Sequence, residues 1–128
     1  MGQQQLLLII LGVIIVGIAI AVGISMFTAG SVQSNKDAII NDLNNLAANA
    51  YQYRIRPSSM GGGSGSYTGY VLSTILSTND NAVYTAQNVT ASAVTFRGTS
   101  SQGYGYVQAI CDTVGKLGTF TFNGQFAQ

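Results

Sequence analysis

An uninterrupted apolar run near the N-terminus constrains this chain more than any other feature. It reads LLLIILGVIIVGIAIAVGISMF, from Leu6 to Phe27, and contains no charged residue. A helix that crosses the hydrocarbon core of a membrane needs ~20 such residues. Leu, Ile and Val each favour insertion by ~0.3–0.6 kcal/mol at the centre of a helix. The run therefore predicts a helix that must be buried in a membrane, in a protein assembly, or in each in turn.

A secretory signal peptide explains the same run less well. Its apolar core has ~7–15 residues, follows basic residues and precedes a small-residue cleavage site. No Lys or Arg stands before Leu6. We therefore expect the apolar helix to be retained after synthesis.

The scarcity of charge excludes several functional classes. Charged residues make up 7% of the chain and the net charge is +1, whereas a typical soluble domain has ~25% charged residues. The five basic residues form no dense patch beyond the pair Arg54 and Arg56, so we expect no nucleic-acid partner. There is no His and only one Cys, Cys111, so an intramolecular disulfide and the usual metal-ligand clusters cannot form. We expect no cofactor, no catalytic residue and no enzyme activity, and we interpret Cys111 as a small buried residue.

Residues 36–55 change the pattern to that of an amphipathic helix. Apolar residues recur four and three positions apart: Ile39, Leu43, Leu46, Ala50 and Tyr53. This stripe predicts one buried helix face, and Pro57 predicts the end of the helix. We expect a single helix over roughly residues 3–55, with Gly30 as the position where it would fray. At ~1.5 Å per residue the helix spans ~80 Å, so its second half lies outside a ~30 Å bilayer core.

The remainder of the chain divides into a Gly/Ser loop over residues 57–66 and a β-rich head over residues 67–128. The loop reads PSSMGGGSGS and is typical of a flexible connector or of an ordered loop packed on its neighbours. Residues 67–77 suit either a short helix or an edge strand. Four β-branched and aromatic segments predict strands: Ala82–Thr90, Ala93–Arg97, Tyr104–Asp112 and Leu117–Asn123.

The spacing of these segments predicts an antiparallel meander of about four strands. Val94 and Phe96 alternate with Thr95 and Arg97, which predicts one buried and one solvated face. A small sheet is not stable alone, so we expect it to cover the amphipathic stripe. The predicted fold class is α+β: a long N-terminal helix, residues 1–56, packed against a small C-terminal antiparallel sheet.

This layout, with an apolar half-helix, an amphipathic half-helix, a Gly/Ser loop and a small sheet, resembles type IV pilins and related filament subunits. In that family a peptidase cuts after a glycine that precedes the apolar run, which here corresponds to Gly2. The family usually has Glu at the fifth mature position, where it pairs with a neighbour's α-amino group. This chain has no Glu, and Gln5 is the candidate that would accept such a hydrogen bond. The family's proline near the end of the apolar segment is also missing, and Gly23 and Gly30 are the positions expected to loosen.

The resemblance implies a structural subunit of an extracellular helical filament. The monomer would be stored in the inner membrane, and pilus assembly machinery would then polymerise it with copies of itself. The apolar helix would serve first as an anchor and then as the filament core. The residues expected to pack in that core are Leu6, Leu7, Ile10, Gly12, Val13, Gly17, Ala21 and Gly23.

Three other functions fit parts of the sequence. A single-pass membrane-anchored extracytoplasmic binding domain explains the apolar helix but not the long amphipathic continuation. A pseudopilin of a secretion system shares the pilin layout, whereas a filamentous-phage coat protein would be almost entirely helical. Separately, Asn88 begins an Asn-Val-Thr triplet, which is an acceptor pattern for N-glycosylation.

Overall fold

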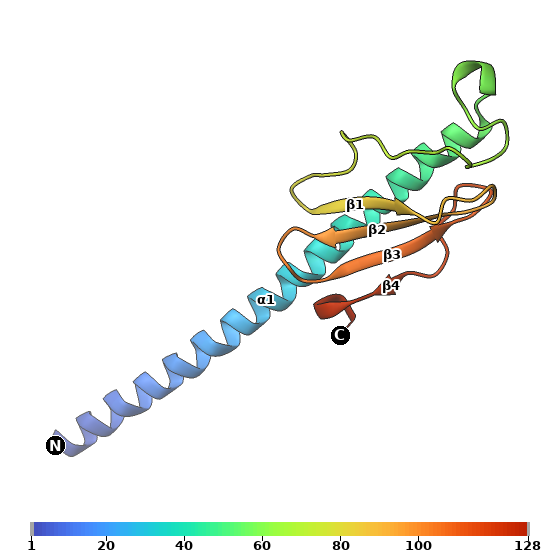
Figure 1. Cartoon of the computed structure of the whole chain (residues 1–128). Coiled ribbons are helices and arrows are strands. Elements are labelled where there is room, and N and C mark those ends of the chain that lie inside the picture. The colour runs from blue at the N-terminus through green and yellow to red at the C-terminus, as the bar shows by residue number, and fades with distance from the viewer. Residues whose placement is uncertain (1, 128) are drawn as a thin grey trace. The chain divides into compact units, whose positions relative to one another are not determined.

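The computed structural model describes residues 2–127 and shows an α+β protein with one long helix and a four-stranded antiparallel sheet (Figure 1). Helix α1 comprises Gly2–Ile55, which is 54 residues. The chain forms two compact units that divide within this helix, Met1–Val32 and Gln33–Gln128. The predicted fold class and the single long helix are therefore confirmed.

The described part of the first unit is helical throughout. No proline occurs in it, and its Leu and Ala residues are good helix formers. Gly30 remains helical, so the fraying expected there is absent. Thr28 donates its side-chain hydroxyl to the carbonyl oxygen of Ile24 at 3.0 Å. This bond satisfies a polar group at the end of the apolar run without breaking the helix.

The second unit combines the later part of α1 with the sheet. The strands are β1 (Ala82–Gln87), β2 (Val94–Ser100), β3 (Tyr106–Cys111) and β4 (Thr121–Phe122). They lie in chain order, and every neighbouring pair is antiparallel (Figure 1). The meander predicted from sequence is confirmed.

The core of this unit lies between α1 and the sheet. Its buried apolar residues come from the helix, from the segment after the loop, and from β1, β2, β3 and the C-terminal turn η2 (Gly124–Ala127). The largest fully buried side chains are Tyr67, Tyr84, Phe96, Phe126, Ile39, Leu43, Val94, Val107 and Cys111. Aromatic contacts add to this packing, since Tyr70 meets Phe96 edge-on with ring centroids 6.1 Å apart.

Gly98 in β2 marks the closest approach of the helix to the sheet. A Cβ atom at this position would lie 2.7 Å from Ile39 Cγ2 and 2.7 Å from Tyr84 Cε1. Non-bonded carbon atoms prefer separations of ~3.5–4.0 Å. The absence of a side chain at Gly98 therefore lets Ile39 pack directly on the strand.

The strand boundaries differ from those predicted. β1 ends at Gln87 because Asn88 has a φ of 50°, which breaks the extended conformation. β2 continues beyond the predicted end at Arg97, because Thr99 and Ser100 pair with Val83 and Ala82. β4 is only two residues long, although an isolated bridge also joins Leu117 to Cys111.

Two further expectations were wrong. Residues 67–77 form neither a helix nor a strand, because they follow the surface in turns and bury Tyr67 and Tyr70 in the core. Thr95 is not solvated, being only 5% exposed. It lies on a central strand opposite Gln87 on one side and Ile110 on the other, and these neighbours leave little room for water.

The Gly/Ser loop over residues 57–66 is ordered and caps the C-terminal end of α1. After the short turn η1 (Ser58–Met60), backbone N–H groups return to the last helical carbonyls. Gly63 donates to Tyr53 at 2.8 Å, and Gly65 donates to Arg54 at 2.6 Å. These bonds satisfy carbonyl groups that a helix end leaves without partners.

Candidate functional site

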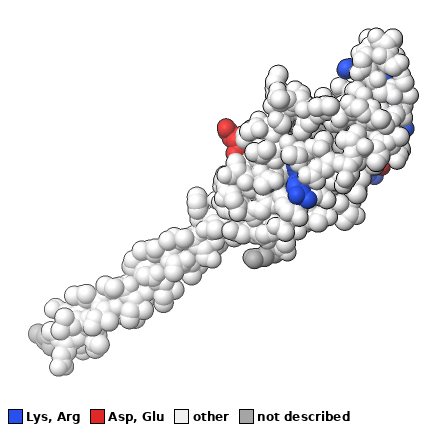
Figure 2. Space-filling view, viewed as in Figure 1, with Lys and Arg blue, Asp and Glu red and all other residues white. Residues whose placement is uncertain are grey.

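The apolar run is the first candidate site. Its large side chains from Leu6 to Phe27 are between 52% and 76% exposed. The most apolar window of α1 has a mean hydropathy of 3.2, and none of that window is buried. Figure 2 shows neither basic nor acidic atoms on the visible face of the N-terminal part of α1. This segment is long and apolar enough to cross a membrane.

The glycines of this helix lie on more than one face. At about 100° per residue, Gly12, Gly23 and Gly30 fall within about 20° of one another around the axis, whereas Gly17 lies about 140° away from Gly12. A Cβ atom at any of the four would meet no other atom within 4 Å. Two separate helix faces therefore offer positions for close approach by another helix.

The predicted core-packing residues are distributed in the same way. Leu6, Ile10, Val13 and Gly17 follow each other at four, three and four positions, so they share one face. Ala21, four positions after Gly17, continues this face, whereas Leu7, Gly12 and Gly23 lie elsewhere around the helix, and the whole set is exposed. A single partner helix would cover only part of this set.

The N-terminal processing and registration residues are helical. Gly2 and Gln5 both belong to the exposed first turns of α1. Met1, the other residue of the expected leader, lies outside the described residues. Cleavage at Gly2 and the pairing role of Gln5 stay predictions.

The amphipathic stripe lies against the sheet. Ile39, Leu43, Leu46 and Ala50 are buried, while Tyr53 is half-buried. The Tyr53 hydroxyl donates to the carbonyl oxygen of Thr68 at 3.0 Å, and its ring meets the Tyr70 ring edge-on at 5.5 Å. The stripe thus brings together the helix, the sheet and the segment after the loop.

A polar residue that the sequence analysis missed extends this stripe by one turn. Asn35 is only 6% exposed. Its side-chain amide donates to the carbonyl oxygen of Asn81 at 3.1 Å and accepts from the Ser100 hydroxyl at 2.7 Å. Its position four residues before Ile39 was the signal that could have placed it on the buried face. Because its side-chain amide binds Asn81 just before β1 and Ser100 in β2, Asn35 orients the helix relative to these strands.

Asp42 forms a second polar contact that the sequence analysis missed. Its Oδ2 atom accepts hydrogen bonds from the Tyr84 hydroxyl, from Asn79 Nδ2 at 2.9 Å and from Asn81 Nδ2 at 3.4 Å. Burial, together with the hydrogen bond to Asp42, raises the pKa of Tyr84. Through these hydrogen bonds the Asp42 carboxylate fixes the turn before β1 to the helix.

Cys111 is fully buried, as expected. Its Sγ atom lies 3.5 Å from the hydroxyl oxygen of Tyr67, whose hydroxyl also donates to the carbonyl oxygen of Asp112. Burial raises the pKa of the Cys111 thiol, so the thiol stays protonated at neutral pH. Within residues 2–127, no group of three or more His, Cys, Asp or Glu side chains is arranged to hold a metal ion.

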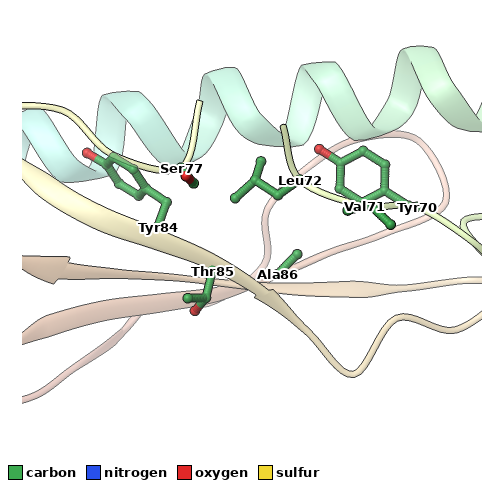
Figure 3. Close-up of a pocket in the computed structure, with 7 residues that line it drawn as sticks. All are labelled: Tyr70, Val71, Leu72, Ser77, Tyr84, Thr85 and Ala86. Carbon is green, nitrogen blue, oxygen red and sulfur yellow. The ribbon is translucent and has the colours of Figure 1, made fainter. Parts of the chain in front are cut away.

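An open groove of about 370 Å³ lies beside β1. The residues that line it are Tyr70, Val71, Leu72, Ser77, Tyr84, Thr85 and Ala86 (Figure 3). The hydroxyls of Tyr70 and Tyr84 point toward α1 and bind Asn49 and Asp42 there. Burial raises the pKa of Tyr70 to about 12. The residues that line the groove are uncharged, and the hydroxyls of its two tyrosines are bound to α1.

Asn88 lies at the exposed turn between β1 and β2. Its side chain is accessible, and the hydroxyl of Thr90 in the same triplet donates to the carbonyl oxygen of Ala93 at 3.2 Å. Thr90 therefore stabilises the turn. Glycosylation at Asn88 stays a prediction.

Together these features define an architecture. A helix able to cross a membrane continues into an amphipathic half that is packed on a small four-stranded antiparallel sheet, an architecture consistent with pilin-like folds. No protein-family model matches the chain, and the searches of curated proteins and of solved structures give no match either.

Proposed function

We propose that this chain is a structural subunit of an extracellular helical filament of the type IV pilus kind, held in the inner membrane before assembly. The observation that carries the proposal is the apolar segment of α1, which is exposed around its whole circumference and has glycines on two faces. A helix of this kind needs apolar surroundings on every side.

The free-energy cost of exposing the apolar segment to water rules out a free monomer in solution. Fully burying a Leu, Ile or Val side chain is worth ~1.5–3 kcal/mol. Summed over Leu6 to Phe27, leaving these side chains in water would cost on the order of tens of kcal/mol. The segment therefore passes from lipid directly into a protein core, and assembly machinery that extracts it supplies the remaining work.

A filament core buries the apolar segment on every side, whereas a dimer buries it on one side only. Two helices in contact bury only the facing stripe of each, whereas a helical array surrounds each helix with several others. Gly17 on one face and Gly12 and Gly23 on another offer close approach to different neighbours. A heterologous contact that does not close on itself generates such an array.

The head has a surface suited to repeated contact. Only 7% of the residues of the whole chain are charged, and the cores of protein interfaces are depleted in charge. Exposed apolar residues on the head include Val71, Ile75 and Val114. In this proposal the heads form the outer layer of the filament and touch one another at these surfaces.

The N-terminus is processed after Gly2 in this proposal, and the Gln5 amide oxygen accepts a hydrogen bond from a neighbour's α-amino group. An amide is a weaker acceptor for an ammonium group than a carboxylate is. The same residue avoids the cost of placing an unpaired carboxylate in lipid, which amounts to several kcal/mol.

The proposal is tested by electron microscopy of sheared surface material from cells with and without the gene. We expect filaments that contain this chain and that disappear on deletion. The matched pair of variants Gly17→Leu and Thr85→Val separates core packing from general effects, because Thr85 is exposed on β1. We expect Gly17→Leu to reduce filament mass at least several-fold and Thr85→Val to leave it unchanged.

Two results would contradict the proposal. One is an unchanged set of filaments after deletion. The other is recovery of the chain only in the membrane fraction under all conditions of growth, which would support a membrane-anchored binding domain instead. Filaments that stay short and cell-attached would favour a pseudopilin within the same structural class.

A further inference from the structure

The apolar run from Leu6 to Phe27 contains no charged group that specifies its axial position against a neighbour, and the hydrogen bond proposed for Gln5 is weaker than an ion pair would be. Residues 2–35 contain no charged side chain, and Lys36 is the first. Leu, Ile and Val side chains repeat along this segment with similar size and shape. Sliding one helix past another by a turn would exchange apolar contacts for equivalent apolar contacts, whereas polar groups are what specify register in packed helices. We therefore expect a further contact that sets register elsewhere in the chain.

The charges of the head gather at two ends. Around the beginning of the head's part of α1 lie four of the charged residues: Lys36, Asp37, Asp42 and Asp80. Asp80 belongs to this group because its neighbours Asn79 and Asn81 both donate to the Asp42 carboxylate. The group has three acidic residues and one basic residue, so its net charge is −2, and we name it the acidic end.

The other group surrounds the C-terminal end of α1. It contains Arg54, Arg56, Asp112 and Lys116. The Tyr67 ring lies 5.6 Å from the Arg54 guanidinium, and its hydroxyl donates to the Asp112 carbonyl, which places Asp112 and Lys116 at this end. The group has three basic residues and one acidic residue, so its net charge is +2, and we name it the basic end. With Arg97, the remaining charged residue, the sum is the chain's +1.

The minority charge at each end is already engaged. The Lys36 ammonium lies 4.0 Å from the centroid of the Phe122 ring. The Asp112 carboxylate accepts the backbone N–H groups of Val114 at 3.0 Å and Lys116 at 2.9 Å. Of the majority charges, Asp42 is bound to Tyr84 and to the turn before β1, and Arg54 lies against the Tyr67 ring, so the other four are the ones left to interact with another molecule.

Four majority charges are exposed. They are Asp37 and Asp80 at the acidic end and Arg56 and Lys116 at the basic end. Asp37 accepts one hydrogen bond, from Gln33 Nε2 at 2.9 Å. Figure 2 shows basic atoms beside the C-terminal end of α1, and acidic atoms on the opposite part of the head. Figure 2 also shows a basic group on the face between them, and the rest of that visible face is uncharged.

We propose that the basic end of one head contacts the acidic end of the next copy, and that this contact sets the axial register of the filament. The partner is a second copy of this chain, because a single chain carries both complementary surfaces and they lie at different places. Such a contact is heterologous and propagates without closing. The inference rests on the proposed filament function and adds the surface that orders it.

The structure also sets the spacing of this contact. Asp37 and Arg56 are 19 positions apart in sequence, which corresponds to about 28 Å along a helix axis. Copies displaced along the filament by about this distance bring the two ends together. Carboxylate-to-ammonium contact across the junction is therefore expected between copies separated by this axial offset.

Cross-linking of wild-type filaments tests the contact without any variant. A carbodiimide joins a carboxyl group to an amine only when the two are in direct contact. Mass spectrometry of the digested filaments is expected to show Lys116 joined to Asp37 or Asp80 of another copy. Mixed filaments from isotopically light and heavy subunits separate links between copies from links within one copy. Intact filaments without any such link would overturn the proposal.

Variants test whether the contact is functional. Arg56→Gln with Lys116→Gln lowers the net charge from +1 to −1, and so does the control, Thr85→Asp with Thr99→Asp, at two exposed positions of the sheet. We expect the first pair to reduce filament mass about tenfold or to give filaments of irregular diameter, and the control to assemble normally. Equal assembly of both pairs would contradict the proposal.

Exchange of the charges provides the decisive variant. A chain with Arg56→Asp, Lys116→Asp, Asp37→Lys and Asp80→Lys keeps the net charge of +1 but reverses both ends. We expect it to assemble to within about twofold of the wild type, although either half of the exchange alone fails. Near-ultraviolet circular dichroism of the tyrosines confirms that the variants are folded. A folded exchange variant that does not assemble overturns this inference alone, whereas a wild type without filaments overturns the proposed function itself.

Discussion

Gly98→Ala tests the packing of the helix on the sheet at its tightest point. The added methyl group would lie 2.7 Å from both Ile39 Cγ2 and Tyr84 Cε1. Gly98 does not have a positive φ, so the backbone by itself accepts alanine. Without a steric conflict, a Gly→Ala change of this kind stabilises a protein by ~0.4–1 kcal/mol, because the unfolded chain loses freedom.

The steric conflict reverses that sign. Inserting a methyl group into a packed core costs ~1–3 kcal/mol. Both neighbours are fully or almost fully buried, so neither has open space to move into. Combining the two terms gives a net loss of about 1–2 kcal/mol. For a folded unit of roughly this size, each kcal/mol lowers the melting temperature by ~4–8 °C.

The assay is thermal unfolding of the full chain in detergent, followed by the tyrosine signal in near-ultraviolet circular dichroism. Gly118→Ala is the matched control, because its Cβ would lie at an ordinary 3.7 Å from the Ile110 carbonyl oxygen. We expect Gly98→Ala to melt about 5–15 °C below the wild type and Gly118→Ala to melt at or above it. Equal melting temperatures for the two variants would refute the reasoning.

Four other outcomes follow from the same structure. Burial raises the pKa of Tyr70 to about 12 and also raises the pKa of Tyr84, so the folded state holds these protons more tightly than the unfolded state does. The free energy of unfolding therefore keeps this contribution below pH ~10 and falls as the pH rises above it. Denaturant titrations at pH 8 and pH 11 would detect the difference. Asp42→Ala removes an acceptor shared by three donors and is expected to cost ~1–3 kcal/mol in the same titration, with Asp42→Asn costing less. Gly63→Ala places a Cβ against the backbone of Ser66 and is expected to loosen the cap, so protease cleavage in the loop should accelerate. Ile14→Lys opposes insertion by ~2.5–3.5 kcal/mol, and a larger fraction extracted from membranes by alkaline carbonate is the expected result.

The polar contacts explain why the helix has one orientation against the sheet. An apolar stripe alone tolerates small rotations, since apolar contacts have no direction. Asn35 binds Asn81 and Ser100, while Asp42 binds Tyr84 and the turn before β1. Because these bonds are directional, rotating the helix would leave buried polar groups without partners, at a cost of ~1–3 kcal/mol each.

The sequence by itself determined the elements whose signal is local. The apolar run from Leu6 to Phe27 and the stripe from Ile39 to Tyr53 have the periodicity of a helix, and Pro57 marks its end. Alternation and β-branched residues were enough to predict four strands in an antiparallel meander. These features depend on neighbours within a few positions, so they can be found without knowledge of the fold.

Only the tertiary structure decided the features that depend on distant residues. Thr95 is buried because neighbouring strands cover it, and β2 extends to Ser100 because β1 offers partners there. The contact of Asn35 with Ser100 spans 65 positions in the chain. The separation of charge between the two ends of the head likewise appears only when the turn that contains Asp80 is folded onto Asp42. Local composition cannot encode such pairings, because each depends on which surfaces the packed helix and sheet bring together.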